Sequence, residues 1–345
     1  MQANPPSPVN LDTVRVLVAD LREARPAVYF ADLLFSASVG WLLFALAVLA
    51  VPWSIKLAAF AVSSVLLYRA LAFIHELFHQ QAMKGFRATW HALAGVPLLI
   101  PFLLYLPIHQ GHHSARSYGT VHDGEYDQFH GRFRRMTLKL FALNLALPLA
   151  LWVRFAVLTP LSALLPGVRR KVIPEFVHMA LRMPFRAAEV KASARREAYW
   201  VEAFCALFGW ALVALAVTGH AAVLLWWAAQ VIAIATLNTV RALCSTHLYV
   251  EDTEGRDARG QLLDSLNVGG GLLTTLLCPV GLRYHALHHI APYLPYHALG
   301  VAHARLLQRL PAGSEYHLVS VDTLREGWDR LVGATCPRPA VQADV

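Results

Sequence analysis

The chain has 345 residues, of which 57% are hydrophobic and only 15% are charged. Soluble domains carry about 25% charged residues, so this composition excludes an ordinary soluble domain and indicates an integral membrane protein. The formal net charge of +8 could suggest a nucleic-acid partner. The basic residues, however, cluster beside hydrophobic segments, as in membrane proteins, and we expect no nucleic-acid binding.

The first hydrophobic segments of the chain predict a helical hairpin. A polar stretch, 1–27, comes first and lacks the form of a secretory signal peptide. Residues 28–51 and 55–74 are then each long and apolar enough to cross a bilayer, which takes about 20 residues of helix. Residues 52–54 (Pro-Trp-Ser) form the tight turn between them, and the second helix leads directly into His75.

Two further apolar stretches are interrupted by proline, which breaks helical hydrogen bonding. Residues 92–108 contain three prolines, and 136–166 contain Pro148 and Pro160 together with Lys139 and Arg154. We expect both stretches to lie in the membrane interface or to re-enter it, although 136–166 could instead form another hairpin.

A second helical hairpin is expected from residues 198–217 and 221–240, with the turn at 218–220. The segment 168–197 before it is strongly basic, whereas neither hairpin turn holds Lys or Arg. Positive-inside logic therefore places 168–197 and both termini in the cytoplasm, with the spans in the inner membrane. The basic residues are Arg169, Arg170, Lys171, Arg182, Arg186, Lys191, Arg195 and Arg196.

Histidines occur in three clusters whose spacing indicates metal binding. The clusters read HELFH, HQGHH and HALHH, and residues three or four apart share one face of a helix. Imidazole is a good ligand for iron, copper, zinc and nickel, and eight imidazoles exceed the four ligands of one ordinary zinc ion. We therefore predict two metal ions, on the cytoplasmic side, held by His75, His79, His109, His112, His113, His285, His288 and His289.

Two other classes of protein share some of these features. His75, Glu76 and His79 match the H-E-x-x-H motif of zinc proteases, but such an enzyme needs only one further ligand, and two H-x-x-H-H clusters exceed that need. A metal transporter or a lipid-binding protein without catalysis is the remaining alternative. A transporter would require ionisable residues inside its spans, where this chain has few.

The three clusters resemble the histidine boxes of the membrane fatty-acid desaturase and hydroxylase superfamily. The resemblance covers about residues 30–310 and includes the run GLRYHALHHIAPYLPYHALGVAH around the third cluster, most like that of acyl-lipid desaturases. It implies an all-α integral membrane fold: four transmembrane helices in two hairpins, interfacial helices and a cytoplasmic histidine-rich cap. It also implies two Fe²⁺ ions and attack by O₂ on an unactivated C–H bond.

The resemblance adds a ninth ligand, because His247 in THLYV matches a His–Leu–Tyr context in acyl-CoA members of the superfamily. Those members have an asparagine four positions earlier that supports an iron-bound water, where this chain has Leu243. Asn238 and Asn267 are candidates to replace it. Carboxylates that could support ligand imidazoles by hydrogen bonds are Asp123 and Asp127, after the second cluster, and Asp264.

The expected organisation is a polar segment 1–27, a membrane domain 28–310 and a tail 311–345. The expected reaction is desaturation of a fatty acyl chain carried on a lipid, CoA, a carrier protein or as free acid. The alternatives are hydroxylation or ketolation, and oxidative decarboxylation to a terminal alkene. No fused electron carrier is expected in the sequence, so a separate ferredoxin or cytochrome would supply electrons, and membrane lipid would surround the spans.

The orientation can be tested by cysteine labelling in a chain that lacks the native cysteines. Because Ser54 lies in a turn without basic residues, Ser54→Cys is expected to react only from the side opposite the cytoplasm. Ala3→Cys near the N-terminus is the matched control and is expected to react only from the cytoplasm. Cytoplasmic labelling of Ser54→Cys would overturn the predicted topology.

Overall fold

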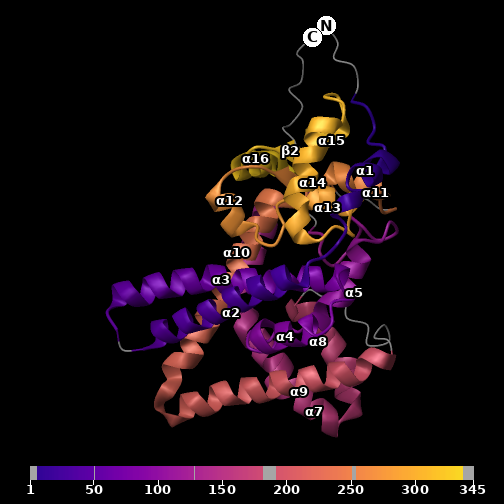
Figure 1. The fold of residues 1–345 in the computed structure, drawn as a ribbon. Helices are drawn as coiled ribbons and strands as arrows, with labels where there is room; N and C mark the ends of the chain where they lie inside the picture. The colour runs from indigo at the N-terminus through magenta and orange to yellow at the C-terminus, as the bar shows by residue number, and fades with distance from the viewer. Residues whose placement is uncertain (1–5, 50, 128, 182–191, 251–253, 337–345) are drawn as a thin grey trace, which may run out of the picture. The chain divides into compact units, whose positions relative to one another are not determined.

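In the residues that it describes, the computed structural model is mostly helical, with one pair of two-residue strands, which confirms the all-α expectation (Figure 1). Contacts divide the chain into two compact units. Unit 1 comprises residues 1–23, 112–140 and 240–345, and unit 2 comprises 24–111 and 141–239. The residues described are 6–49, 51–127, 129–181, 192–250 and 254–336; part of the basic segment, 182–191, and the tail from Pro337 onward therefore lie outside them.

The first hairpin of unit 2 consists of α2 (Pro26–Val48) and α3 (Trp53–His79), which lie side by side and antiparallel (Figure 1). Proline begins α2 at a position where its missing N–H costs no helical hydrogen bond. The helices approach closely at Gly40, whose carbonyl accepts a hydrogen bond from Ser63 Oγ at 2.8 Å. A Cβ on Gly40 would lie 2.8 Å from Leu67 Cγ, so glycine permits this packing.

The second predicted hairpin is also present. α9 and α10 are separated at Thr218 and Gly219, where the backbone leaves helical geometry and Gly219 adopts a φ of 95°. Glycine reaches such positive φ values without the steric cost that a side chain would add. The remaining helical elements of the middle of the chain are α4 (Phe86–Trp90), η2 (His91–Gly95), α5 (Phe102–His112), α6 (Phe133–Trp152), η3 (Val153–Leu158), α7 (Thr159–Leu164), η4 (Val168–Val172), α8 (Ile173–Leu181), α9 (Ala192–Leu215), η6 (Ala216–His220) and α10 (Ala221–Ser245).

Within the described part of the chain, four helical stretches are long and apolar enough to cross a membrane: Pro26–Val48, Trp53–His79, Phe133–Leu164 and Arg196–Ser245. The third is helical throughout 133–164 despite Pro148, which makes it a further candidate span, and the expected location of 136–166 in the interface stays a prediction. The charge of its buried Arg154 is neutralised, since that side chain forms an ion pair with Glu202 of α9. Residues 92–108 form no helix of spanning length, and their location in the interface stays a prediction.

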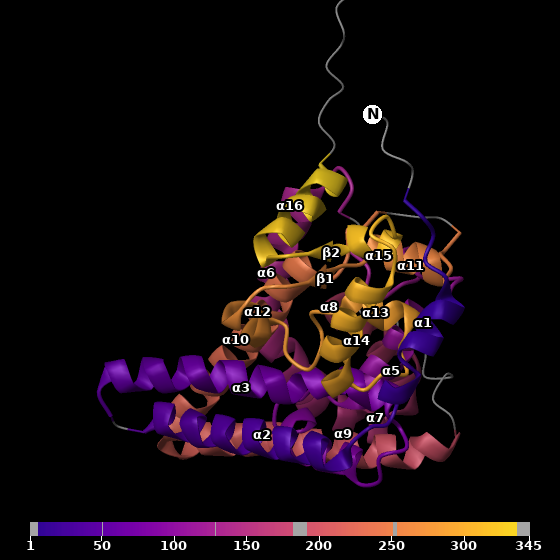
Figure 2. The ribbon, with the colours of Figure 1, turned by 45° about the horizontal axis from the view of Figure 1, so that its top comes forward.

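Unit 1 is built from short elements that pack on one hydrophobic core. The core combines Val14 of α1 with Ala286 and Leu287 of α13 and with Leu306 of α14, and Figure 2 shows α1 beside α14. The elements are α1 (Leu11–Leu17), η1 (Ala19–Leu21), α11 (Ala258–Asp264), β1 (Asn267–Val268), α12 (Leu272–Leu277), α13 (His285–Ile290), α14 (Tyr296–Arg309), α15 (Glu315–Leu318), β2 (Ser320–Val321) and α16 (Leu324–Thr335).

The two ends of the described chain are joined inside unit 1. Ser7 N–H donates to the Gly313 carbonyl at 2.8 Å, and the Ser7 carbonyl accepts from Glu315 N–H at 3.0 Å. The Glu315 carboxylate also pairs with Arg259, and the hydrogen bond from that guanidinium lowers the pKa of Glu315. The polar segment before the first span is thus part of a folded unit, while the three-part domain division remains a prediction.

The packing of α16 on the end of α10 can be tested at Gly327. A Cβ there would lie 2.0 Å from the backbone oxygen of Cys244, so we expect Gly327→Ala to destabilise the protein by about 1–3 kcal/mol through overpacking. Gly333→Ala in the same helix meets nothing within 4 Å and should be neutral or stabilising, by up to about 1 kcal/mol. Thermal unfolding of both variants in detergent measures the difference, and equal unfolding temperatures would contradict the packing.

Candidate metal centre

Unit 1 brings four buried histidines together at one point. His112 ends α5, His247 follows α10, and His285 and His289 lie one helical turn apart on α13. One ring nitrogen from each lies within 4.8 Å of those of the other three. The Nε2 atom of His285 is 3.0 Å from that of His247 and 3.1 Å from that of His289.

This spacing fits a metal ion. Imidazole nitrogens bound to a transition metal lie about 2.0–2.1 Å from it, so neighbouring ligands at right angles are about 3 Å apart. Burial lowers the pKa of His247 and of His285 well below the usual histidine value. Both rings are therefore neutral at physiological pH and have a lone pair available for coordination.

Hydrogen bonds to the opposite ring nitrogen orient three of these histidines. His112 Nδ1 lies 2.9 Å from Asp123 Oδ2, and His289 Nδ1 lies 3.0 Å from Gln261 Oε1. An acceptor at Nδ1 holds the proton there and leaves Nε2 as the coordinating atom, which is the usual arrangement around metal-bound histidine. Burial alone would lower the pKa of His112, but the Asp123 carboxylate, together with the more distant Glu125 and Asp264, outweighs it, so the pKa is raised.

His247 is oriented by a chain of hydrogen bonds that ends at a buried carboxylate. Tyr118 Oη lies 3.0 Å from His247 Nδ1 and donates to Asp264 Oδ2 at 3.1 Å. Asp264 also accepts from Tyr126 Oη at 2.7 Å and pairs with Arg256 at 3.2 Å. Burial raises the pKa of Asp264 to about 6 against the lowering effect of these partners.

The short helix α13 is held in place by Asn267 of β1. Its Oδ1 accepts the Leu287 N–H at 2.9 Å, and β1 pairs in parallel with β2 through Asn267↔Ser320. A helix of six residues is not stable by itself in water, so this hydrogen bond and the core packing of Leu287 fix the positions of the α13 histidines.

The remaining box histidines are also close to one another within their own units. In unit 1, His113 Nε2 lies 3.2 Å from His288 Nε2. In unit 2, His79 Nε2 lies 2.9 Å from His109 Nε2, and the His75 ring centroid is 4.7 Å from that of His109. Tyr105 Oη lies 2.8 Å from His109 Nδ1, which leaves the other nitrogen for coordination.

The structure thus places the ninth histidine, His247, against the second and third boxes in unit 1. Among the candidate supporting residues, Asp123 contacts His112, and Asp264 reaches His247 through Tyr118. Asn267 supports the backbone of α13 instead of a ring. The metal role of every one of these residues remains a prediction.

Three other positions singled out in the sequence lie differently. Asp127 is half-buried and its carbonyl accepts the Phe129 N–H, while Asn238 is exposed on the part of α10 in unit 2. Leu243 is buried and apolar, so its side chain offers no donor or acceptor in place of the asparagine of the acyl-CoA relatives.

Sequence reasoning missed several supporting residues. Tyr118 follows the second box in the run HHSARSYGT, and Gln261 and Ser265 precede the third box by about 20 residues. Ser265 Oγ lies 3.2 Å from His247 Nδ1. Hydrogen-bonding side chains near a box are common in any sequence, and no spacing rule separates these three from their neighbours.

The fold and the site define an all-helical integral membrane protein with a buried polyhistidine site suited to a transition metal. The family model described as "Fatty acid desaturase" matches residues 51–320. The chain is also 38% identical over 320 residues to a ceramide hydroxylase of Caulobacter vibrioides (strain NA1000 / CB15N), and the match covers 90% of this chain and 89% of the relative. The chain therefore belongs to the fatty acid desaturase family and is a membrane oxidoreductase.

The role of Asp123 can be tested by Asp123→Ala. Because the carboxylate holds the His112 proton on Nδ1, we expect its loss to weaken metal binding about 10–100-fold. Iron content of the purified protein, measured during titration with a chelator, gives the affinity. Asp329→Asn, which alters an exposed carboxylate of unit 1, is the matched control, and equal affinities in the two variants would contradict the assignment.

Proposed function

We propose that this chain is an O₂-dependent di-iron hydroxylase that acts on a long-chain lipid of the ceramide type. The observation that carries the proposal is the 38% identity to a ceramide hydroxylase across 90% of the chain. Because only about a tenth of the chain lies outside this match, it extends far beyond the three histidine boxes.

The donor set supports the metal assignment. His112, His247, His285 and His289 would hold one iron ion, and the remaining box histidines complete a set of nine imidazoles for two. When bound, the iron would activate O₂ for attack on an unactivated C–H bond. One oxygen atom enters the lipid and the other leaves as water, which consumes two electrons and two protons from outside the lipid.

The residues of the chain contribute orientation and a dry environment. Asp123, Gln261 and Tyr118 hold the protons of three imidazoles on Nδ1, so the coordinating Nε2 atoms stay fixed without rearrangement. All four histidines of the unit 1 group are at least 96% buried. Burial excludes bulk water, which would otherwise compete for the metal and for the oxidant.

Desaturation is the second candidate, because the matching family model is that of fatty acid desaturases. The resemblance of the histidine boxes favoured this reaction, and it stays unconfirmed. Hydroxylation and desaturation share the first hydrogen abstraction and differ only in the fate of the carbon radical that it leaves, so the ligand residues do not separate them. The named relative favours the hydroxylase alternative.

The electrons are proposed to come from a separate ferredoxin or cytochrome on the cytoplasmic side. The basis is the orientation expected from the positive-inside rule, in which the boxes and both termini lie in that compartment. The purified enzyme would then require an added reductant system for turnover.

The reaction can be tested with purified, iron-loaded protein, a reductase–ferredoxin couple, and long-chain ceramide under isotopically heavy oxygen gas. We expect a ceramide that carries one heavy oxygen atom, detected by mass spectrometry. His288→Ala should lose this product together with bound iron. His220→Ala, at the exposed turn between α9 and α10, is the matched control and should retain both.

Each outcome identifies a reaction. A ceramide that has lost two hydrogens without gaining oxygen would reject hydroxylation and establish desaturation. Product from free fatty acid or acyl-CoA but not from ceramide would keep the chemistry and reject the substrate class. Full iron and full turnover in His288→Ala would reject the histidine assignment.

A further inference from the structure

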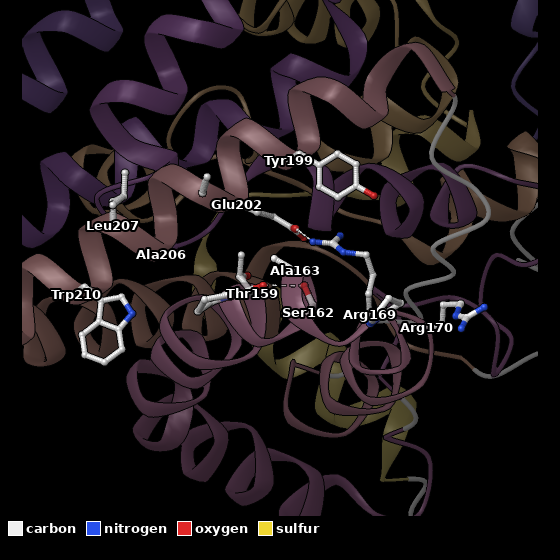
Figure 3. A pocket seen from close by; sticks show the side chains of 13 residues that line it. Thr159, Ser162, Ala163, Arg169, Arg170, Tyr199, Glu202, Ala206, Leu207 and Trp210 are labelled. Carbon is white, nitrogen blue, oxygen red and sulfur yellow. Dashed lines mark hydrogen bonds and ion pairs between the residues drawn. The ribbon is translucent and has the colours of Figure 1, made fainter.

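Unit 2 contains a groove of about 720 Å³ between α7, η4 and α9 (Figure 3). No histidine of the three boxes is among the residues that line it. Its lining is mixed, with charged side chains from η4 and α9 together with small and apolar side chains from α7 and α9. The residues that give the groove its charge and its apolar surface are Arg169, Arg170, Glu202, Ala206, Leu207 and Trp210.

The polar part of the groove has an excess of positive charge. Glu202 is buried and pairs with two arginines, since Arg154 Nη2 lies 2.5 Å from its Oε1 and Arg169 Nη2 lies 2.5 Å from its Oε2. Figure 3 shows the Arg169 guanidinium directed at this carboxylate. Arg170 beside it is exposed, so three guanidinium groups accompany one carboxylate.

Arg169 is held at this position by more than its ion pair. Its guanidinium carbon lies 4.6 Å from the centroid of the Tyr199 ring, which is a cation–π contact. With Glu202 on one side and Tyr199 on the other, the side chain has little freedom to leave. The positive charge is therefore a fixed feature of the groove.

The other part of the groove is apolar. It follows α9 past Ala203 and Ala206, whose small side chains leave room, to Leu207 and Trp210. The exposed fraction is 65% for Leu207 and 51% for Trp210. Exposed apolar side chains of this size on a helix that can span a membrane are suited to contact with acyl chains.

We propose that this groove binds one anionic glycerophospholipid of the surrounding bilayer, with its phosphate at Arg169 and Arg170 and one acyl chain along α9 over Ala206 to Trp210. Charge complementarity selects the anionic headgroup, because a buried carboxylate already paired with two arginines leaves net positive charge. This proposal does not depend on the proposed reaction.

The test measures lipid binding to delipidated, detergent-purified protein by native mass spectrometry, with phosphatidylglycerol and phosphatidylcholine of identical acyl chains as probes. The wild type should retain phosphatidylglycerol preferentially. Arg169→Gln and Arg170→Gln should each weaken it about fivefold, and Ala206→Trp should weaken it by filling the acyl half. Arg309→Gln combined with Arg325→Gln, which removes two charges from unit 1, is the matched control and should bind as wild type does.

Several results would overturn the proposal. Equal retention of the two lipids, retention unchanged by the groove variants, or an equal loss in the control would each do so. Complete displacement by millimolar inorganic phosphate would show that the groove selects the anion and not the lipid. Unfolding temperatures of the lipid-free variants check their fold, and Arg170→Gln, which leaves the pair between Arg169 and Glu202 intact, decides the outcome if Arg169→Gln unfolds.

Discussion

The arrangement of the site depends on the different roles of the two nitrogen atoms of the imidazole rings. On one side, Nδ1 is tied to an acceptor of the protein, as in His112 with Asp123 and His289 with Gln261. On the other side, the Nε2 lone pairs would repel one another without a cation between them, yet His285 Nε2 lies 3.0 Å from that of His247 and 3.1 Å from that of His289, which is the separation expected around a shared metal ion. Without the outward hydrogen bonds, the rings could rotate and the inward nitrogens would no longer converge.

The rest of unit 1 holds this arrangement rigid. α13 has too few residues to be a stable helix alone, so its histidines depend on Asn267, on the core around Leu287 and on the β1–β2 pair. The Tyr118–Asp264 chain likewise connects His247 to α11. Polar groups in such a buried network are costly if they lose a partner, which favours one geometry over its alternatives.

Several polar and charged side chains of the long apolar helices also have partners on a neighbouring helix. Asp32 of α2 binds Arg69 of α3, and Arg154 binds Glu202 of α9. Gln230 of α10 donates to Ser64 and accepts from Ser63 of α3. In hydrocarbon, isolated charges are expensive and mark functional or structural positions; each pair here also fixes one helix against another within unit 2.

The sequence by itself determined the class of fold and the chemical type of the site. Twenty-residue apolar runs, the tight turn at 52–54 and the break at Gly219 are local signals, and histidines at i and i+4 need only a helix to share a face. His247 was found only through a family resemblance, since a lone histidine carries no local signal. The continuous helix at 133–164 was not predicted, because the neutralisation of Arg154 by Glu202 requires contact between residues 48 positions apart in the chain.

Only the tertiary structure decided which side chains form hydrogen bonds with the histidine rings. Gln261 reaches His289 across 28 residues of chain and Tyr118 reaches His247 across 129, and no periodicity encodes such contacts. The same holds for the groove beside Glu202, whose charge and apolar lining come from three separate elements. Helix propensity and hydrophobic period are properties of neighbouring residues, whereas hydrogen-bond partners are chosen by the packing of distant ones.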